Sequence, residues 1–245
     1  MSFTRPQRGR PRGIIRRLLR WLILLVVAAL LLSVGWVVAY KYVDPPTTSL
    51  MLRDTLEGHS VAYSWRDLDR IDPNMPRAVI TAEDRDFCAH NGFDMDAIRD
   101  AFERNQEGGT LRGGSTISQQ TAKNAFLWVE RSWVRKGLEA YFTFLIEQIW
   151  GKRRIMEVYL NIAETGINTY GVEEGAKRYF GHGADTLSRR EAAQIAAVLP
   201  SPQKRSGKNP KGQVRRYARN VERWIRVVKD EGLDACLALD DGAGR

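Results

Sequence analysis

Hydrophobic positions divide the chain into one long apolar run and a series of shorter periodic segments. Residues 21–40 contain no charged side chain. As a helix these residues rise roughly 30 Å, which matches the hydrocarbon core of a bilayer. The length of the run and the poor cleavage site at its end favour a transmembrane helix over 21–40 rather than a cleaved signal peptide.

Beyond a proline-containing linker at 41–49, apolar side chains recur every three or four residues, which is the helical period. This period predicts helices near 78–82, 94–102, 117–122, 133–150, 155–162, 191–199 and 214–228. No strand alternation extends beyond a few residues. We therefore predict a mainly α protein with one domain over 50–232 and an acidic C-terminal tail over 233–245.

Composition and charge narrow the class of protein. The 245 residues include 7 Trp, 8 Tyr and 8 Phe, too many large apolar side chains for a disordered chain. The net charge of +9 by itself suggests nucleic acid or an anionic membrane as partner. However, residues 1–20 hold seven arginines without an acid and residues 203–229 hold ten basic residues against one acid, so the remainder is slightly acidic. This separation excludes a nucleic-acid partner.

The two basic segments lead to different predictions, one about membrane orientation and one about a helix surface. The segment at 1–20 is a basic tail that places the N-terminus in the cytoplasm and everything after residue 40 outside it, by the positive-inside rule. The basic helix near 214–229 has two interpretations, contact with anionic lipid headgroups or an ordinary solvated face.

The two cysteines carry little information in the sequence. Cys88 and Cys236 lie far apart and form no CxxC pattern. Although disulfides form in the compartment outside the cytoplasmic membrane, we expect two isolated thiols.

Three acidic side chains, Glu83, Asp84 and Asp86, directly follow the apolar run at 78–82. They are explained either by a solvated helix end or by a functional carboxylate. A carboxylate at the edge of an apolar helix can have a raised pKa and serve as a general acid or base.

Two further patterns suggest an anion site. Paired glycines at 113–114 precede Ser115 and Thr116, so a helix that begins there exposes backbone N–H groups. The spacing is not that of a Walker P-loop. Farther along the chain, Arg135 and Lys136 lie one helical turn before Glu139. This second pattern is either a surface salt bridge or a phosphate clamp beside a carboxylate.

Four motifs occur in order and together carry a resemblance. E-D-x-x-F-x-x-H-x-G lies at 83–92, G-G-S-T-I-x-Q-Q-x-x-K-N at 113–124, R-K-x-x-E at 135–139 and I-x-E-x-Y-L-N at 155–161. They resemble the peptidoglycan glycosyltransferases of glycosyltransferase family 51, over roughly 50–224. The single anchor and the lack of a second domain are similar to the monofunctional biosynthetic transglycosylases.

The resemblance implies a lysozyme-like, two-lobed glycosyltransferase domain with a cleft between the lobes. It also implies polymerisation of lipid II into glycan strands with release of undecaprenyl pyrophosphate. The protein would lie in the bacterial inner membrane with a periplasmic catalytic domain. Its partners would be lipid II, the growing glycan strand, the bilayer, and proteins of cell-wall synthesis or division.

The same resemblance implies roles for individual residues. Glu83 is expected to be the general base, and Lys123, Arg135 and Lys136 to neutralise the pyrophosphate. Glu139 resembles the second essential carboxylate of the family, and it is expected either to orient these cations or to hold a divalent metal such as Mg²⁺. The residues expected to position substrate are Asp84, Ser115, Gln119, Gln120 and Asn161.

An apolar cluster at 125–129, joined by Trp133, follows the second motif directly. It is either packed in the core or placed where a lipid-linked substrate enters from the bilayer.

Two other functions remain as alternatives. A membrane-anchored lysozyme-like hydrolase or lytic transglycosylase shares the single key glutamate but has no pyrophosphate to neutralise, so Lys123, Arg135 and Lys136 argue against it. A non-enzymatic division scaffold leaves the first three motifs unexplained.

Overall fold

The computed structural model describes residues 12–106 and 114–240, and this part of the chain is mainly helical. The helices are α1 (Arg12–Tyr42), α2 (Ser49–Leu56), α3 (Asn74–Glu83), α4 (Met95–Gln106), α5 (Ile117–Phe126), α6 (Trp133–Ile149), α7 (Lys152–Ile162), α8 (Gly171–Phe180), α9 (Arg189–Ala196) and α10 (Gly212–Asp230), with short 3₁₀ turns η1 (Leu68–Arg70), η2 (Ala184–Thr186) and η3 (Ala235–Leu237). The predicted helices are confirmed.

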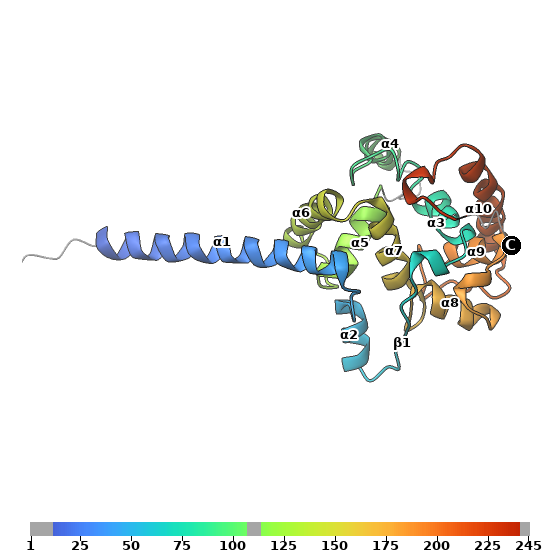
Figure 1. Cartoon of the computed structure of the whole chain (residues 1–245), viewed down its shortest axis with the longest axis horizontal. Coiled ribbons are helices and arrows are strands. Elements are labelled where there is room, and N and C mark those ends of the chain that lie inside the picture. The colour runs from blue at the N-terminus through green and yellow to red at the C-terminus, as the bar shows by residue number, and fades with distance from the viewer. Residues whose placement is uncertain (1–11, 107–113, 241–245) are drawn as a thin grey trace, which may run out of the picture.

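Helix α1 projects from one end of the domain (Figure 1). It contains the predicted run at 21–40 and extends past it on both sides. Its 31 residues rise roughly 45 Å at the usual 1.5 Å per residue. Residues 15–42 form a candidate membrane span by length and composition, and the side chains of residues 15–32 are exposed.

The last turns of α1 pack against the domain. The indole N–H of Trp150 donates to the Val37 carbonyl over 2.7 Å, and the guanidinium of Arg154 donates to the Tyr40 carbonyl. The ring of Trp36 meets that of Phe126 edge-on, with centroids 5.3 Å apart. Because these contacts lie near the start of the domain, they fix the direction in which α1 leaves it.

The domain core consists of two groups of helices. Helix α3 packs against α9 and α10, whereas α5 packs against α6 and α7. Fully buried aliphatic and aromatic side chains from both groups form one continuous core. The C-terminal end of α3 and the N-terminal end of α5 meet between the groups.

A small three-stranded sheet lies beside α8, with strand order β1-β3-β2. Strand β1 (Ala62–Tyr63) runs parallel to β3 (Thr169–Tyr170), and β2 (Glu164–Gly166) runs antiparallel to it. The sequence did not predict these strands because two or three residues are too few to show an alternating pattern.

The prediction of two isolated thiols is wrong. Cys88 and Cys236 form a disulfide, with Cα atoms 5.5 Å apart across a sequence separation of 148 residues. The pairing depends on tertiary packing, because the segment after α10 folds back onto the domain and buries Leu237 completely. The domain boundary at 232 stays a prediction, although residues 233–240 contact the domain through this disulfide and η3.

The basic helix α10 lies at the end of the domain opposite to α1 (Figure 1). Its apolar stripe, including Val221, Ile225 and Val228, is buried, and its basic side chains face outward. A bilayer spanned by α1 is therefore on the far side of the domain. This geometry disagrees with headgroup contact and favours the solvated face.

Candidate active site

Two adjoining cavities lie where the two helix groups meet. The first, which we call the Glu83 cavity, has a volume of about 1120 Å³ and is lined by the end of α3, the start of α5 and part of α10. The second, the Lys123 cavity, has a volume of about 1000 Å³ and is lined by α5, α6 and the segment between them. Both cavities share Ser115, Gln120, Arg131 and Pro200, so they form two halves of one cleft.

Glu83 is the last residue of α3, and its two carboxylate oxygens differ in their surroundings. Oε2 accepts a hydrogen bond of 2.8 Å from the side-chain amide of Gln120. Oε1 is buried and has no hydrogen-bond partner among the described residues. Burial raises the pKa of Glu83, while the Gln120 hydrogen bond and the charge of Arg205 oppose the rise. One oxygen is therefore available to accept a proton.

Asp84 is tied to the start of α5. Its Oδ2 accepts from the Ile117 backbone N–H over 2.9 Å, and its Oδ1 lies 2.9 Å from Nε2 of His90. Because Nδ1 of His90 accepts from the Gly92 N–H, Nε2 carries the proton and donates to Asp84. Asp84 thus lines the Glu83 cavity with both oxygens engaged, which suits a positioning function better than substrate contact.

Helix α5 begins with a capping box. The Thr116 side chain accepts from the Gln119 N–H, and the Gln119 side chain accepts from the Thr116 N–H. Thr116, and not the neighbouring Ser115, is therefore the N-cap of α5. Ser115 remains exposed between the cavities, and Gln119 lines the Lys123 cavity while its carbonyl oxygen holds the cap.

The Lys123 cavity gathers the predicted cations. Lys123 comes from α5, and Arg135, Lys136 and Glu139 come from successive turns of α6. Lys136 forms an ion pair with Glu139. Arg135 is buried, and its Nε has no hydrogen-bond partner within the described parts of the chain.

The charged side chains of this cavity shift the pKa of Lys123. Burial lowers the pKa of Lys123, the Glu139 carboxylate raises it, and the charge of Arg135 lowers it further. An anion bound here relieves this repulsion because it supplies the missing negative charge. The cavity is thus suited to a phosphate or pyrophosphate group.

A divalent metal does not fit the described residues of this cavity. Glu139 is the one carboxylate among the lining side chains, and it already pairs with Lys136. Mg²⁺ prefers carboxylates and other oxygen ligands, whereas this lining brings several cations around a single carboxylate. The structure favours the alternative in which Glu139 orients the cations.

Asn161 is not brought to the cleft with the other predicted residues. It lies on α7 with 1% of its surface exposed and lines neither cavity. Its side-chain amide accepts from the Arg66 N–H over 2.7 Å and donates to the Arg66 carbonyl over 2.8 Å. Asn161 therefore anchors the segment that follows β1.

Several lining residues were not predicted from the sequence, among them three with large polar side chains. Arg131 lines both cavities, and Arg205 lines the Glu83 cavity while donating to the Ala197 carbonyl. Tyr217 of α10 donates to the Ala82 carbonyl over 2.7 Å, next to Glu83. No sequence signal marked them, because Arg131 and Arg205 lie outside the motifs and Tyr217 belongs to the apolar stripe of α10.

The apolar cluster at 125–129, with Trp133, is divided between the core and the cleft. Phe126 and Leu127 are buried in the core. Trp128 and Trp133 line the Lys123 cavity and are 40% and 89% exposed. Exposed aromatic side chains thus border the cavity that carries the cations.

Comparison with known proteins identifies the family of this chain. Residues 51–229 match the family model described as transglycosylase, and the chain belongs to this family. It is therefore a peptidoglycan glycosyltransferase with a mainly α, lysozyme-like fold.

Several relatives are similar over nearly their whole length, and each bears the name biosynthetic peptidoglycan transglycosylase. A protein of Caulobacter vibrioides is 48% identical over 91% of this chain and 98% of its own length. One of Rhodospirillum centenum is 46% identical, over 92% and 98% respectively. A protein of Xanthomonas campestris pv. campestris is 43% identical, over 92% and 95%.

Proposed function

We propose that this enzyme polymerises lipid II into glycan strands and releases undecaprenyl pyrophosphate, with Glu83 as general base. The observation that carries the proposal is the placement of the unpartnered Oε1 of Glu83 in one half of a cleft whose other half holds Lys123, Arg135 and Lys136. A base and an anion site side by side are what transfer from a sugar pyrophosphate requires.

In the proposed reaction, Glu83 Oε1 takes the proton from the 4-hydroxyl of the acceptor sugar. The hydroxyl oxygen forms a bond to the anomeric carbon of the donor while the bond from that carbon to the pyrophosphate oxygen breaks, with inversion. Gln120 holds the other oxygen of Glu83 and so directs Oε1.

The leaving pyrophosphate gathers negative charge as its bond breaks. Lys123, Arg135 and Lys136 stabilise this charge, so no protonated acid is needed. Glu139 keeps Lys136 in place through their ion pair. The exposed Trp128 and Trp133 contact the lipid part of the substrate.

We also propose that α1 spans the cytoplasmic membrane, with the N-terminus in the cytoplasm and the domain on the outer side. The seven arginines in residues 1–20 support this orientation. The Cys88–Cys236 disulfide supports it independently, because disulfides persist outside the cytoplasm. Partners among the proteins of cell-wall synthesis or division remain a prediction.

The synthetic and hydrolytic functions are separated by one paired assay. The purified protein is incubated with lipid II in one reaction and with preformed uncrosslinked glycan in another. We expect polymer from lipid II and an unchanged length of the preformed glycan. Shortening of the glycan without polymer formation would instead identify a hydrolase or lytic enzyme.

A further inference from the structure

The segment that directly follows Glu83 is held in place by contacts on two sides. We call residues 84–92 the Asp84 loop. Within it, His90 holds Asp84, which accepts from the Ile117 N–H at the start of α5, and the loop ends at Gly92. Gly92 has a φ of +90°, and a Cβ there would lie 2.8 Å from the Thr143 side chain. The loop therefore has little room to change its path at that end.

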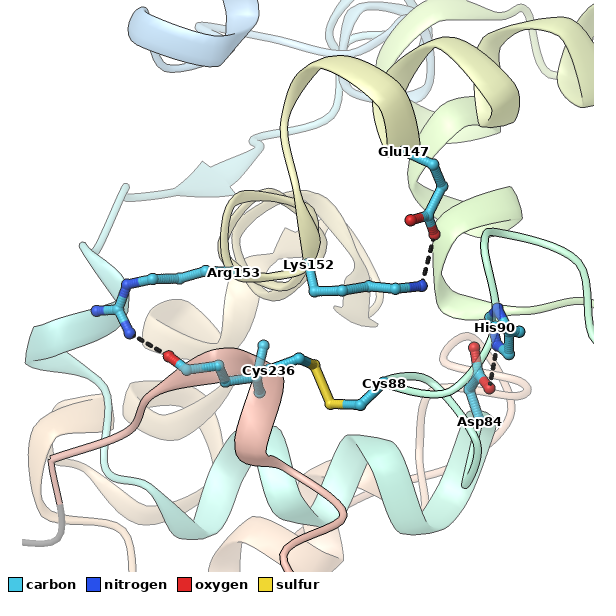
Figure 2. Close-up of a disulfide and its surroundings, with 8 residues drawn as sticks. Asp84, Cys88, His90, Glu147, Lys152, Arg153 and Cys236 are labelled. Carbon is cyan, nitrogen blue, oxygen red and sulfur yellow. Dashed lines mark hydrogen bonds and ion pairs between the residues drawn. A yellow bond between two sulfur atoms is a disulfide. The ribbon is translucent and has the colours of Figure 1, made fainter.

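The inner side of the Asp84 loop is fixed by a buried aromatic ring and a buried ion pair. Phe87 is fully buried, and Nζ of Lys152 lies 4.5 Å from its ring centroid. The same Nζ lies 2.7 Å from Glu147, which also accepts from Ser118 of α5. Figure 2 shows Lys152 extending toward Glu147 on one side of the loop.

The outer side of the Asp84 loop is held by the C-terminal segment, residues 234–237. Cys236 bonds to Cys88 of the loop, as Figure 2 shows. Two residues earlier, Asp234 lies 2.6 Å from Nε of Arg77 on α3, in a buried ion pair. One residue later, the Leu237 carbonyl accepts from Arg153 of α7. The segment thus connects the loop to α3 and α7.

We propose that residues 234–237 and the Cys88–Cys236 disulfide form a brace that positions Glu83 for proton transfer. Cys88, Cys236 and Asp234 are then positioning residues for the glycosyltransferase reaction. This inference rests on the proposed role of Glu83 as the general base.

These contacts explain how a disulfide outside the cleft affects the position of Glu83 inside it. Arg77 and Glu83 belong to the same helix, so the Asp234 contact holds α3 directly. Cys88 holds the loop that keeps Asp84 on the N-terminus of α5. Helix α5 in turn carries Gln120, which fixes Glu83 Oε2. A displacement of about 1 Å at a reacting group can cost about a hundredfold in rate.

A brace that only stabilises the fold would leave the titration of Glu83 unchanged. A brace that positions the loop also keeps water from Glu83, whose pKa is raised by burial. The other charged and titratable groups around Glu83 are Asp84 beside it, Lys123 of α5, Tyr159 of α7, Tyr217 of α10 and Arg205 after α9. Burial is the largest cause of the raised pKa of Glu83, so the entry of water lowers this pKa more than a weakened Gln120 hydrogen bond raises it. The pH profile therefore separates the two interpretations.

The test compares full-length wild-type enzyme with a Cys88→Ser/Cys236→Ser variant and an Asp234→Asn variant, in detergent with lipid II. Initial polymerisation rates are measured from pH 5 to pH 9, with and without a trialkylphosphine. The phosphine breaks the S–S bond and becomes the phosphine oxide with an oxygen from water, and two protons complete the thiols. Thiol labelling measures the reduced fraction, and circular dichroism measures the folded fraction.

We expect the double variant to lose about tenfold in kcat with little change in KM, because the cations Arg135 and Lys136 belong to α6, whereas the brace contacts α3, α7 and the Asp84 loop. The acidic limb of its pH profile shifts to lower pH as water reaches Glu83. The phosphine reproduces both effects in the wild-type enzyme and changes nothing in the double variant. Asp234→Asn, which keeps the disulfide, gives the same shift with a smaller loss.

Three results would overturn the brace. The first is an unchanged kcat and pH profile in fully reduced, folded enzyme. The second is a loss of rate that only follows the unfolded fraction. The third is a Glu83→Gln enzyme that polymerises at the wild-type rate, which removes the base as well. If the Glu83→Gln variant is inactive and the double variant is fully active, the brace is refuted but the role of Glu83 as the base is not.

Discussion

At the scale of single residues, Glu83 combines burial with one strong hydrogen bond. The bond from Gln120 engages only Oε2, so Oε1 keeps its capacity to accept a proton. Because burial raises the pKa of Glu83, the carboxylate is a stronger base than an exposed glutamate. The same burial means that the basic form is lost at a higher pH than usual when the solution is acidified.

Replacement of Gln120 by leucine tests this environment. The hydrogen bond from Gln120 stabilises the charged carboxylate, so its loss raises the pKa of Glu83 further. A general base must be deprotonated, so the acidic limb of the kcat profile is expected to move to higher pH. Polymerisation rates between pH 5 and pH 9 measure this limb. A limb that moves to lower pH would contradict the proposed environment.

Lys123 belongs to the other half of the cleft, and its replacement by methionine removes a charge from the proposed pyrophosphate site. Loss of one stabilising group in such a site typically costs about 10²–10³ in kcat. Lys177→Met is the matched control, since Lys177 lies on α8 and pairs with Glu173 and Glu174. Steady-state rates with lipid II measure both variants. Equal rates for the two would refute the role of Lys123.

At the scale of elements, the start of α5 joins the two halves of the cleft. Its cap, Thr116, also donates to the Gly92 carbonyl over 2.7 Å, so the helix and the Asp84 loop share one anchor. Gln120 and Lys123 lie one and two turns farther along the same helix. A shift of α5 therefore moves the support of the base and the anion site together.

Two capping boxes allow a matched comparison of stability with activity. Thr116→Ala and Ser188→Ala each remove the cap of such a box, at α5 and α9 respectively. Each loss is expected to lower the free energy of unfolding by about 1 kcal/mol in urea denaturation. Only Thr116→Ala should also lower kcat. An equal effect of both variants on kcat would show that α5 does not position the site.

The helical elements were predictable because their apolar periods and caps are local. The cap at Thr116 and the capping box at Ser188 follow from side chains a few residues apart. The contacts of Asn161 with Arg66 and of Cys88 with Cys236 span 95 and 148 residues, respectively. Such pairs are set by tertiary packing, which no local pattern records. The motifs therefore located most of the cleft but not the residues that support it.

At the scale of the whole molecule, packed aromatic rings connect α1 to the cleft. Phe126, at the end of α5, stacks on Tyr40 and meets Trp36 of α1. The exposed Trp128 and Trp133 follow shortly after it and line the Lys123 cavity. This arrangement holds the proposed anion site beside the end of the candidate membrane helix, where we expect the headgroup of a lipid-linked substrate.

The proposed topology predicts the outcome of limited proteolysis on spheroplasts. A C-terminal epitope tag is expected to be removed by external protease, whereas an N-terminal tag remains protected until the membrane is permeabilised. Both tags are followed by immunoblotting. Protection of the C-terminal tag in intact spheroplasts, with digestion after permeabilisation, would contradict the orientation.

The central claim is that Glu83 is the base of a glycan-polymerising cleft. Its most direct test is the rate of lipid II polymerisation by the Glu83→Gln variant, which preserves shape but cannot accept the proton. We expect a loss of about 10²–10⁴ in kcat with the protein still folded and its disulfide intact. Polymerisation by the folded variant at the wild-type rate would contradict the account.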